Sequence, residues 1–412
     1  MADLFDKCRG DGGYFGAFRT RGDEYFTRPV LEGLPGPHMK FHGREVIVWA
    51  LNNYLGLTDN PEIARASLQA VQEWGTFTPM GSRMLTGNTE QHEELERKLA
   101  EFLQKPAACL FNYGYLGVLG TISALIGKDD VIIIDKLSHA SIVDATILAS
   151  AGRRFRPFNH NDMNDLESQL KGANKERKGG ILIVTEGVFG MRGDIANLPA
   201  ICDLKEQYDA RLLIDDAHGF GVMGDHGRGS GEYYGVQDRV DLYFGTFAKT
   251  FAAIGGVTAG DTDPVEYIRY NARTNIFAKS LPMVYVQTIM ATLNVITSRP
   301  HLRARLWEIT KMLQQGLVKL GYEIGDTKSP ITPVYVPAGS EETAMKMIRM
   351  LREEYGVFVS GVTYPVVPRG IVLFRMIPTA SHTEEDVDRT LHAFKELRDR
   401  MGIDLKSAAF AI

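Results

Sequence analysis

A lysine follows a predicted strand in the stretch GTFAKT. Lys249 comes shortly after the apolar run 242–244 and lies among small and hydroxyl side chains. An amine that forms a Schiff base must be partly desolvated, because only the neutral amine attacks a carbonyl. The end of a buried strand in an α/β cleft provides that setting, and cofactors bind at such ends. A lysine on a surface loop would have a similar sequence, so Lys249 alone is a weak signal.

Two acids end another apolar run. Residues 212–214 predict a buried strand, and Asp215, Asp216 and then His218 follow it. A buried carboxylate without a cationic partner is costly. A protonated pyridine nitrogen would be such a partner for Asp215, and the charged ring would then act as an electron sink. A helix N-cap, where aspartate is common, is the alternative interpretation.

Two further signals are weaker. His139 follows the predicted strand 131–135 and could stack on an aromatic cofactor, although a lone histidine is more often a hydrogen-bonded buried residue. Gly114 lies between aromatic residues at the predicted start of a helix, where backbone N–H groups can approach a phosphate. The stretch has neither the G-x-x-x-x-G-K-[ST] nor the G-x-G-x-x-G spacing.

The elements that must position these residues alternate along the chain. Buried strands spaced by helices predict an α/β fold with a mostly parallel sheet and helices on both faces. The predicted strands of this part are 131–135, 180–185, 211–214 and 242–244, and its clearest helices are 61–74 and 90–103.

The C-terminal part has a different pattern. A helical stretch over 282–320, interrupted at Arg299-Pro300, leads into a small α+β domain. Its predicted elements are strands at 331–336, 357–359 and 371–376 and helices at 341–355 and 383–400. We therefore expect an irregular N-terminal arm over 1–60, a large domain over 61–290 and a small domain over 291–412.

Composition excludes several classes of protein. The 412 residues include 46 Lys and Arg against 51 Asp and Glu, so no basic excess indicates nucleic-acid binding. Cys8, Cys109 and Cys202 form neither a disulfide framework nor a zinc cluster, which favours a reducing compartment and no metal. No run reaches the ~18 apolar residues of a membrane span, and the N-terminus lacks the apolar core of a signal peptide. We expect a soluble, cytoplasmic protein with at most peripheral membrane contact.

Together these features resemble the α-oxoamine synthases, fold-type I transferases that use pyridoxal 5′-phosphate (PLP). The resemblance extends from about Leu51 to about Leu397. The stretches that carry it are NNYLGL at 52–57, GSR at 81–83, SHASI at 138–142, TEGVF at 185–189, DDAHG at 215–219, GTFAK at 245–249 and RMIPTASHT at 375–383.

The resemblance implies a role for each matching residue. Lys249 would bond covalently to PLP and later move protons, and Asp215 would pair with the pyridine nitrogen. His218 would face the ring hydroxyl, and His139 would stack on the ring and orient the amino-acid carboxylate. The other implied cofactor contacts are Gly114, Tyr115, Glu186, Thr246, Ala278 and Ser280, and the implied substrate contacts are Asn52, Arg83 and Arg375.

The chain departs from the family pattern at several positions. Gly190 replaces a common serine, Ala248 replaces a serine or glycine, and Ala278 stands where many relatives have a phosphate-binding serine from the neighbouring subunit. Two extra cations, Arg192 and Lys279, lie nearby in sequence and could pair with a sulfonate, or they are solvated surface charges. The stretch 76–80 is one residue longer than usual.

The resemblance implies a decarboxylative Claisen condensation of an amino acid with an acyl thioester. It is closest to bacterial serine palmitoyltransferases and cysteate acyltransferases, which favours serine or cysteate, a long acyl chain on coenzyme A or acyl carrier protein, and a 3-keto precursor of sphingolipids or sulfonolipids. The serine assignment is open because Gly219 stands where the serine enzymes often have serine. The supporting stretches are 245–261, 271–273 and 328–336, whereas 363–370 is similar to glycine acetyltransferases.

Other activities remain open at this point. Within the family they are those of glycine C-acetyltransferase and 8-amino-7-oxononanoate synthase; from other classes they are an aminotransferase and a non-catalytic subunit. Lys249, Asp215 and His139 are all present, which disfavours the last. The resemblance also implies a homodimer with shared active sites, in which 275–280 reaches the site of the partner subunit.

Overall fold

The computed structural model describes residues 3–10, 12–13, 15–21, 24–75, 79–150 and 155–402. The chain forms two compact units, which are described separately: Asn52–Arg305, and Met1–Leu51 together with Leu306–Ile412. The functional division at residues 60 and 290 stays a prediction. Residues 76–78, in the stretch that is longer than usual, lie outside the described residues.

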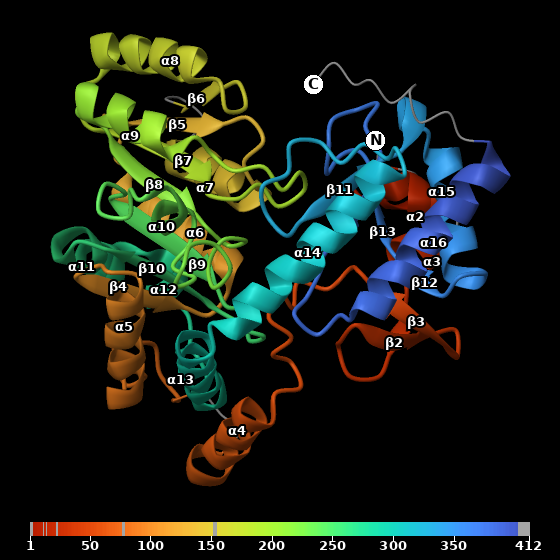
Figure 1. The fold of residues 1–412 in the computed structure, drawn as a ribbon. Helices are drawn as coiled ribbons and strands as arrows, with labels where there is room; N and C mark the ends of the chain where they lie inside the picture. The colour runs from red at the N-terminus through yellow and green to blue at the C-terminus, as the bar shows by residue number, and fades with distance from the viewer. Residues whose placement is uncertain are drawn as a thin grey trace. The chain divides into compact units, whose positions relative to one another are not determined.

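A seven-stranded sheet forms the centre of the unit Asn52–Arg305 (Figure 1). Its strands follow the order β4-β10-β9-β8-β7-β5-β6, and neighbours run parallel except at β10, which is antiparallel to both β4 and β9. The predicted mostly parallel α/β sheet is therefore confirmed. The strands are β4 (Ala107–Phe111), β5 (Val131–Asp135), β6 (Phe155–Phe158), β7 (Ile181–Glu186), β8 (Arg211–Asp215), β9 (Leu242–Thr246) and β10 (Gly256–Gly260).

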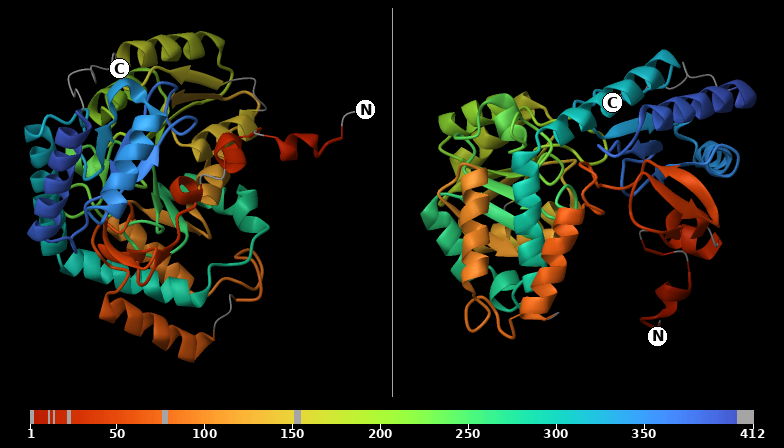
Figure 2. Two further views of the ribbon diagram at one scale, coloured as in Figure 1. Left: turned by 90° about the vertical axis from the view of Figure 1, so that its right-hand side faces the viewer. Right: turned by 60° about the horizontal axis from the view of Figure 1, so that its bottom comes forward.

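Helices cover both faces of this sheet, as Figures 1 and 2 show. On one face, alternate side chains of the strands join α6, α7 and α11 in one apolar core. Helices α5, α8 and α9 pack against the strands outside that core. The helices of the unit are α4 (Pro61–Trp74), α5 (Glu90–Phe102), α6 (Gly114–Leu125), α7 (Ala140–Ser150), α8 (Met163–Glu176), α9 (Leu198–Gln207), α10 (Ser230–Tyr234), α11 (Thr262–Asn271), α12 (Arg273–Ile276) and α13 (Met283–Ser298).

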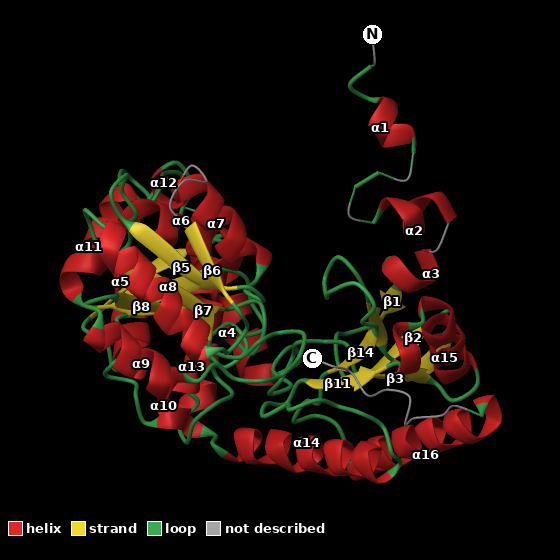
Figure 3. Ribbon diagram, turned by 90° about the horizontal axis from the view of Figure 1, so that it is seen from above, coloured by secondary structure: helices red, strands yellow, loops and turns green. Residues whose placement is uncertain are grey.

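The second unit is an α+β assembly with two small sheets, whose strands are yellow in Figure 3. One has the order β1-β2-β3-β12 and the other β11-β14-β13. Strands β1, β2 and β3 come from the N-terminal stretch described below. The other strands of the unit are β11 (Thr332–Tyr335), β12 (Val357–Phe358), β13 (Ser360–Val362) and β14 (Leu373–Met376). Its helices are α1 (Asp6–Arg9), α2 (Gly16–Arg21), α3 (Glu24–Thr27), α15 (Glu341–Glu353), α16 (Glu384–Met401) and most of α14 (His301–Lys319).

The expectation that residues 1–60 are irregular is wrong in one part. Strands β1 (Leu31–Glu32), β2 (His38–Phe41) and β3 (Arg44–Val48) form there, and β3 pairs with β12. The tight loop between β2 and β3 is His42-Gly43, and both residues have positive φ, as two-residue hairpins require. This stretch supplies three of the four strands of one sheet of the small unit.

Two absences concern the described ranges alone. No helix within them is long and apolar enough to cross a membrane. Nor do those residues contain a cluster of three side chains that would hold a metal ion.

Candidate active site

The candidate site lies at the carboxyl ends of β7, β8 and β9. Glu186 ends β7 and is the register partner of Asp215, which ends β8. Asp215 in turn pairs with Phe244 on β9, and Lys249 follows that strand by three residues. Because these strands are parallel, their carboxyl ends, and with them Glu186, Asp215 and the segment that leads to Lys249, lie at one edge of the sheet.

Two buried acids give this edge its electrostatic character. Asp215 is only 6% exposed, and burial raises its pKa, while the charges of Lys249 and His139 oppose that rise. Burial and the neighbouring Asp215 likewise hold the pKa of Glu186 well above its usual range. The side-chain oxygens still have donors: the backbone N–H of Ala217 lies 3.1 Å from Asp215 Oδ1, and that of Gly190 lies 3.2 Å from Glu186 Oε2. The edge therefore favours cations beside Asp215.

His139 lies in the loop after β5 and retains an exposed edge. Its Nδ1 lies 2.8 Å from the Ser141 hydroxyl and accepts a hydrogen bond from the Ser141 backbone N–H at 3.2 Å. Partial burial lowers the pKa of His139, Lys249 adds to the effect, and Asp215 opposes it. A neutral ring held at Nδ1 by its own helix N-terminus is suited to stacking and to donating from Nε2.

His218 is fixed by Tyr54, which belongs to the NNYLGL stretch but to which the resemblance assigns no role. The hydroxyl of the fully buried Tyr54 lies 2.8 Å from His218 Nδ1. On the other side of the ring, a Cβ added to Gly190 would lie 2.5 Å from His218 Nε2. The glycine that replaces a common serine therefore makes room for this histidine ring.

The start of α6 and the end of β9 lie close together. A Cβ on Gly114 would lie 2.7 Å from Thr246 Oγ1, so only glycine lets the backbone approach so closely. The Thr246 hydroxyl donates to Gly255 O at 3.2 Å and accepts from the backbone N–H of Ala248 at 3.3 Å. Tyr115 is 41% exposed, and its ring lies 6.5 Å from that of His139. Backbone N–H groups in the first turn of a helix, beside a hydroxyl, suit a phosphate.

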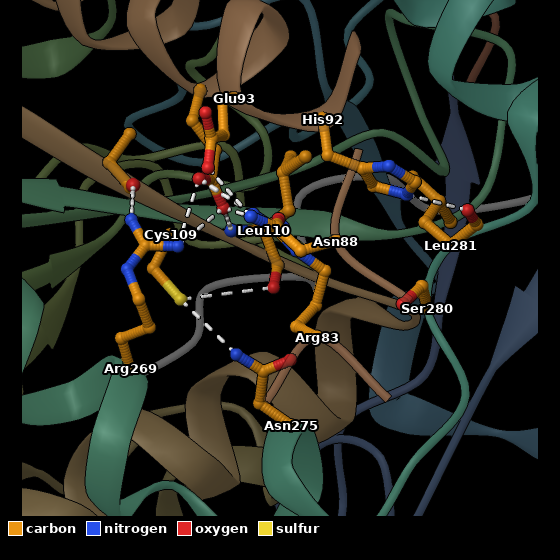
Figure 4. Close-up of polar contacts among 12 residues, drawn as sticks. Arg83, Asn88, His92, Glu93, Cys109, Leu110, Arg269, Asn275, Ser280 and Leu281 are labelled. Atoms are coloured by element: carbon orange, nitrogen blue, oxygen red, sulfur yellow. Dashed lines mark hydrogen bonds and ion pairs between the residues drawn. The ribbon is translucent and has the colours of Figure 1, made fainter. Parts of the chain in front are cut away.

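Arg83 has a tight set of partners inside its own chain (Figure 4). Its guanidinium forms a bidentate ion pair with Glu96, at 2.8 and 3.0 Å, and donates to Asn88 at 2.7 Å. Arg269 binds the same Glu96 carboxylate at 2.9 Å. These contacts give Arg83 a structural task, and its expected contact with substrate stays a prediction. Glu96 and Arg269 were not recognised in the sequence, although an acid on the buried face of a helix was an available signal.

The remaining implied site residues are distributed as follows. The Ser280 hydroxyl donates to Gly87 O at 2.6 Å within its own chain, and Ala278 is half-buried two residues before it. Asn52 is half-buried at the start of the same unit. Arg375 lies on β14 of the other unit. The roles implied for these residues stay predictions.

The residues present fit PLP. A buried carboxylate beside a lysine suits a protonated ring nitrogen, and the close approach of Gly114 and Thr246 leaves backbone donors for a phosphate. The sheet topology, the strand-end acids and the lysine after β9 together define a fold-type I enzyme.

Comparisons with known proteins support this class of enzyme. The family model of class I and II aminotransferases matches residues 44–394. A cysteate-C-fatty acyltransferase of Capnocytophaga ochracea is 46% identical over 404 residues, 97% of this chain and 96% of that protein. An 8-amino-7-oxononanoate synthase of Thermoanaerobacter pseudethanolicus is 40% identical over 379 residues, 92% of this chain and 94% of that protein.

Solved structures match over a similar span. A high-resolution structure of SPT (serine palmitoyltransferase) with a PLP internal aldimine superposes with a TM-score of 0.90 at 30% identity, covering 98% of this chain and 100% of that chain. The chain therefore belongs to the class I and II aminotransferase family and, within it, to the α-oxoamine synthases.

Proposed function

We propose that this protein is a PLP-dependent acyltransferase that joins cysteate to a long-chain acyl thioester. The observation that carries the amino-acid assignment is the 46% identity, over almost the full length of both chains, to a cysteate-C-fatty acyltransferase. Serine is the second candidate, because a structure of SPT superposes over nearly the whole chain.

The reaction balances as a decarboxylative condensation. The Cα of cysteate forms a bond to the acyl carbon, the thioester C–S bond breaks and a thiol leaves. The Cα–H bond breaks before the condensation, and the carboxylate leaves afterwards as carbon dioxide. Cα and the leaving thiolate are then each protonated, one by the proton taken from Cα and the other by a proton from solvent, and the product is an α-amino ketone with a sulfonate group. When bound, PLP supplies an aldehyde for the amines and a ring that delocalises the negative charge at Cα.

The residues of this chain would divide the remaining work. Lys249 would hold the cofactor covalently and, once released by the incoming amino acid, take the Cα proton. Asp215, buried beside it, would keep the ring nitrogen protonated. His139 would cover the ring and orient the substrate carboxylate. Arg375 would bind that carboxylate through its planar guanidinium, which suits two parallel hydrogen bonds.

The two extra cations each have a partner within the chain. The Nε of Arg192 lies 3.8 Å from Asp194 Oδ1, and the Lys279 amine donates to Met80 O at 2.7 Å. An anionic substrate would have to compete with these contacts. The preference for cysteate therefore rests on the sequence identity to the cysteate-C-fatty acyltransferase, and the contact of either cation with a sulfonate stays a prediction.

We also propose a homodimer with shared sites, as the family resemblance implies. The exposed Phe277, which is 75% exposed, and the neighbouring Ala278 would belong to the segment that meets the partner subunit. Light scattering on the purified holoenzyme measures this directly, and a monomer at micromolar concentration would contradict it.

The test is a panel of substrates. The purified holoenzyme is incubated with cysteate, serine, alanine or glycine and with acyl thioesters of several lengths on coenzyme A and on acyl carrier protein. Products are identified by mass spectrometry, and thiol and carbon dioxide release are quantified. We expect kcat/KM for cysteate with a long acyl chain to exceed that for serine about ten-fold or more, which corresponds to ~1.4 kcal/mol.

Controls and contrary outcomes are defined for this panel. Lys249→Ala should abolish product, whereas Lys171→Ala, at an exposed helix position, should not change it. A product formed only from glycine and a short acyl group, or 8-amino-7-oxononanoate itself, would contradict the proposal. Amino-group transfer to a keto acid without thiol release would instead indicate an aminotransferase.

A further inference from the structure

His160 lies between two carboxylates at the edge of the candidate site. Its Nδ1 is 3.0 Å from Asp135 Oδ1, and its Nε2 is 2.6 Å from Asp194 Oδ2. The three side chains are 14%, 1% and 13% exposed, in the order His160, Asp135 and Asp194. Both ring nitrogens carry a proton when they donate to two ionised carboxylates at once, so this geometry suits the imidazolium.

One carboxylate belongs to the loop that carries His139. Asp135 ends β5, four residues before His139, and its Oδ1 accepts from the Leu137 backbone N–H at 2.8 Å. Its Oδ2 accepts from the backbone N–H of Asn161 at 3.0 Å. Asp135 therefore links the root of the His139 loop to the turn that holds His160.

The other carboxylate belongs to the loop between β7 and α9. Asp194 lies at the foot of this loop, where Phe189 N donates to Asp194 O at 2.9 Å and Val188 forms a bridge with Ile195. The same loop presents Gly190, which donates to Glu186 and lies under the ring of His218. A shift of Asp194 would therefore displace Gly190 and, through it, the ring of His218.

The charges around His160 are balanced. Asp135 on β5 and Asp194 on the β7–α9 loop face it, and Arg192 on that same loop lies 3.8 Å from Asp194. The ring of Phe189 meets the imidazole edge to face at 4.4 Å. The two acids outweigh burial and raise the pKa of His160 to about 9. Deprotonation would leave one carboxylate without its donor.

We propose that His160 is a positioning residue whose imidazolium fastens the β7–α9 loop to the end of β5, and so holds Gly190 and His139 in place around the cofactor. Its effect on catalysis rests on the function proposed above, whereas its effect on the loop does not. The histidine acts through other residues and touches neither the substrate nor the cofactor.

The first test measures the loop without any substrate. In protein with ¹³C-labelled histidine, the His160 signal is assigned by its loss in His160→Gln. We expect it to titrate above pH 8 and to move down by about one unit in Asp194→Asn, because one charged partner has been removed. Trypsin should cleave after Arg192 about ten-fold faster in His160→Gln, because a charged hydrogen bond that closes the loop is lost.

The second test separates charge from shape. His160→Lys should restore part of the protection from trypsin, whereas His160→Gln should not. The matched control is His226→Gln, which removes an exposed histidine paired with Glu232 at 2.6 Å and should leave cleavage after Arg192 unchanged. If His160 titrates near pH 6.5 in the wild-type protein, or if Lys and Gln at this position give equal cleavage rates, the proposal is overturned.

The third test connects the loop to catalysis. The apparent dissociation constant for PLP should rise about ten-fold in His160→Gln, and kcat/KM for the amino acid should fall ten- to hundred-fold, as misplacement of groups around a reacting centre allows. An unchanged kcat/KM together with faster cleavage would overturn the positioning role. Loop protection that follows the charge at His160, combined with no condensation on any substrate, would contradict the proposed function alone.

Discussion

Two histidines of this protein solve a similar problem in opposite ways. His160 follows β6 in the unit Asn52–Arg305, and His382 follows β14 in the other unit. Each fixes a turn that adjoins a candidate site residue. His160 does so as a cation between two acids. His382 does so as a neutral ring packed against an aromatic side chain.

His382 is buried against an aromatic side chain. Its ring stacks on the fully buried Trp49, with centroids 3.9 Å apart and planes 5° apart. Its Nδ1 accepts from the backbone N–H of Thr379 at 3.0 Å, and burial lowers its pKa to about 4. The nearby Asp386 already binds His38 at 2.7 Å and caps α16. The stack holds the turn that follows Arg375, the residue expected to bind the substrate carboxylate.

The difference shows that the groups packed around a histidine ring set its charge. Two acids select the imidazolium, whereas an aromatic face and a backbone donor select the neutral ring. As a result, the two units should respond to pH in opposite directions.

The largest effect should come from removing the aromatic partner of His382. Trp49→Ala should lower the free energy of unfolding by about 3–5 kcal/mol, because it leaves a cavity in the core of the small unit and deprives His382 of its stack. Urea unfolding followed by circular dichroism measures this. Trp74→Ala, at a residue that is 42% exposed, is the control. Equal losses in the two variants would contradict the role of the stack.

The contributions of His382 and His160 to stability should change with pH in opposite directions, each by an amount similar to the loss expected in Trp49→Ala. His382 has a folded pKa of about 4, below that of an unfolded histidine, so its contribution is complete above pH ~6.5 and is lost as the pH falls towards 4. His160 has a folded pKa of about 9, so its contribution is complete below pH ~6.5 and is lost as the pH rises towards 9.

Each change is on the order of 3 kcal/mol at its far limit, from ~1.4 kcal/mol per pKa unit. The free energy of unfolding should therefore be measured from pH 4 to 10. In His382→Gln it should no longer fall towards acid pH, and in His160→Gln it should no longer fall towards alkaline pH. If one substitution removed the loss of stability at both acid and alkaline pH, the contrast between the two histidines would be wrong.

A steric change in the site should have a smaller effect. Gly190→Ser would place a Cβ 2.5 Å from His218 Nε2, so the ring must shift, which disturbs its 2.8 Å contact with the Tyr54 hydroxyl. We expect a loss of about 1–3 kcal/mol in stability, typical of overpacking, together with weaker PLP binding measured by absorbance. Gly10→Ala, where the added carbon meets no neighbour, is the control. Unchanged PLP binding in Gly190→Ser would show that His218 tolerates the displacement.

The smallest effect should come from His38. Its imidazole binds Asp386, but it is 44% exposed, so His38→Ala should cost less than about 1 kcal/mol. Thermal unfolding can detect this difference. A loss as large as that of Trp49→Ala would mean that the small unit depends on charge as well.

Much of the fold could be predicted from periodicity and end signals. Helix α4 begins and ends where expected, because Asn60 caps it and Pro61 occupies its first turn. Strand β5 also lies where its apolar run predicted. Strand β10 had no such signal, since Gly256 and Gly260 replace the β-branched residues of a typical strand. A Cβ at Gly256 would lie 2.7 Å from Phe244 on β9, so packing requires glycine there.

The site was predictable where it depends on strand ends and not where it depends on partners from distant segments. Lys249, Asp215 and Glu186 converge because parallel strands end at one edge of the sheet. By contrast, no local pattern indicates that the guanidinium of Arg83 is held by Glu96, or that His160 has acids from two other loops as neighbours. Such partners are set by the tertiary arrangement.

The reversed direction of β10 has a consequence for how Lys249 reaches its position during folding. Thr246 pairs with Gly256, so the segment that holds Lys249 is closed at both ends by adjacent strands of a single hairpin. Closing so short a loop costs little chain entropy, whereas Asp215 and Glu186 come together only after a helical crossover between parallel strands. We expect Lys249 to be in position early in folding, with Asp215 and Glu186 reaching their places beside it later.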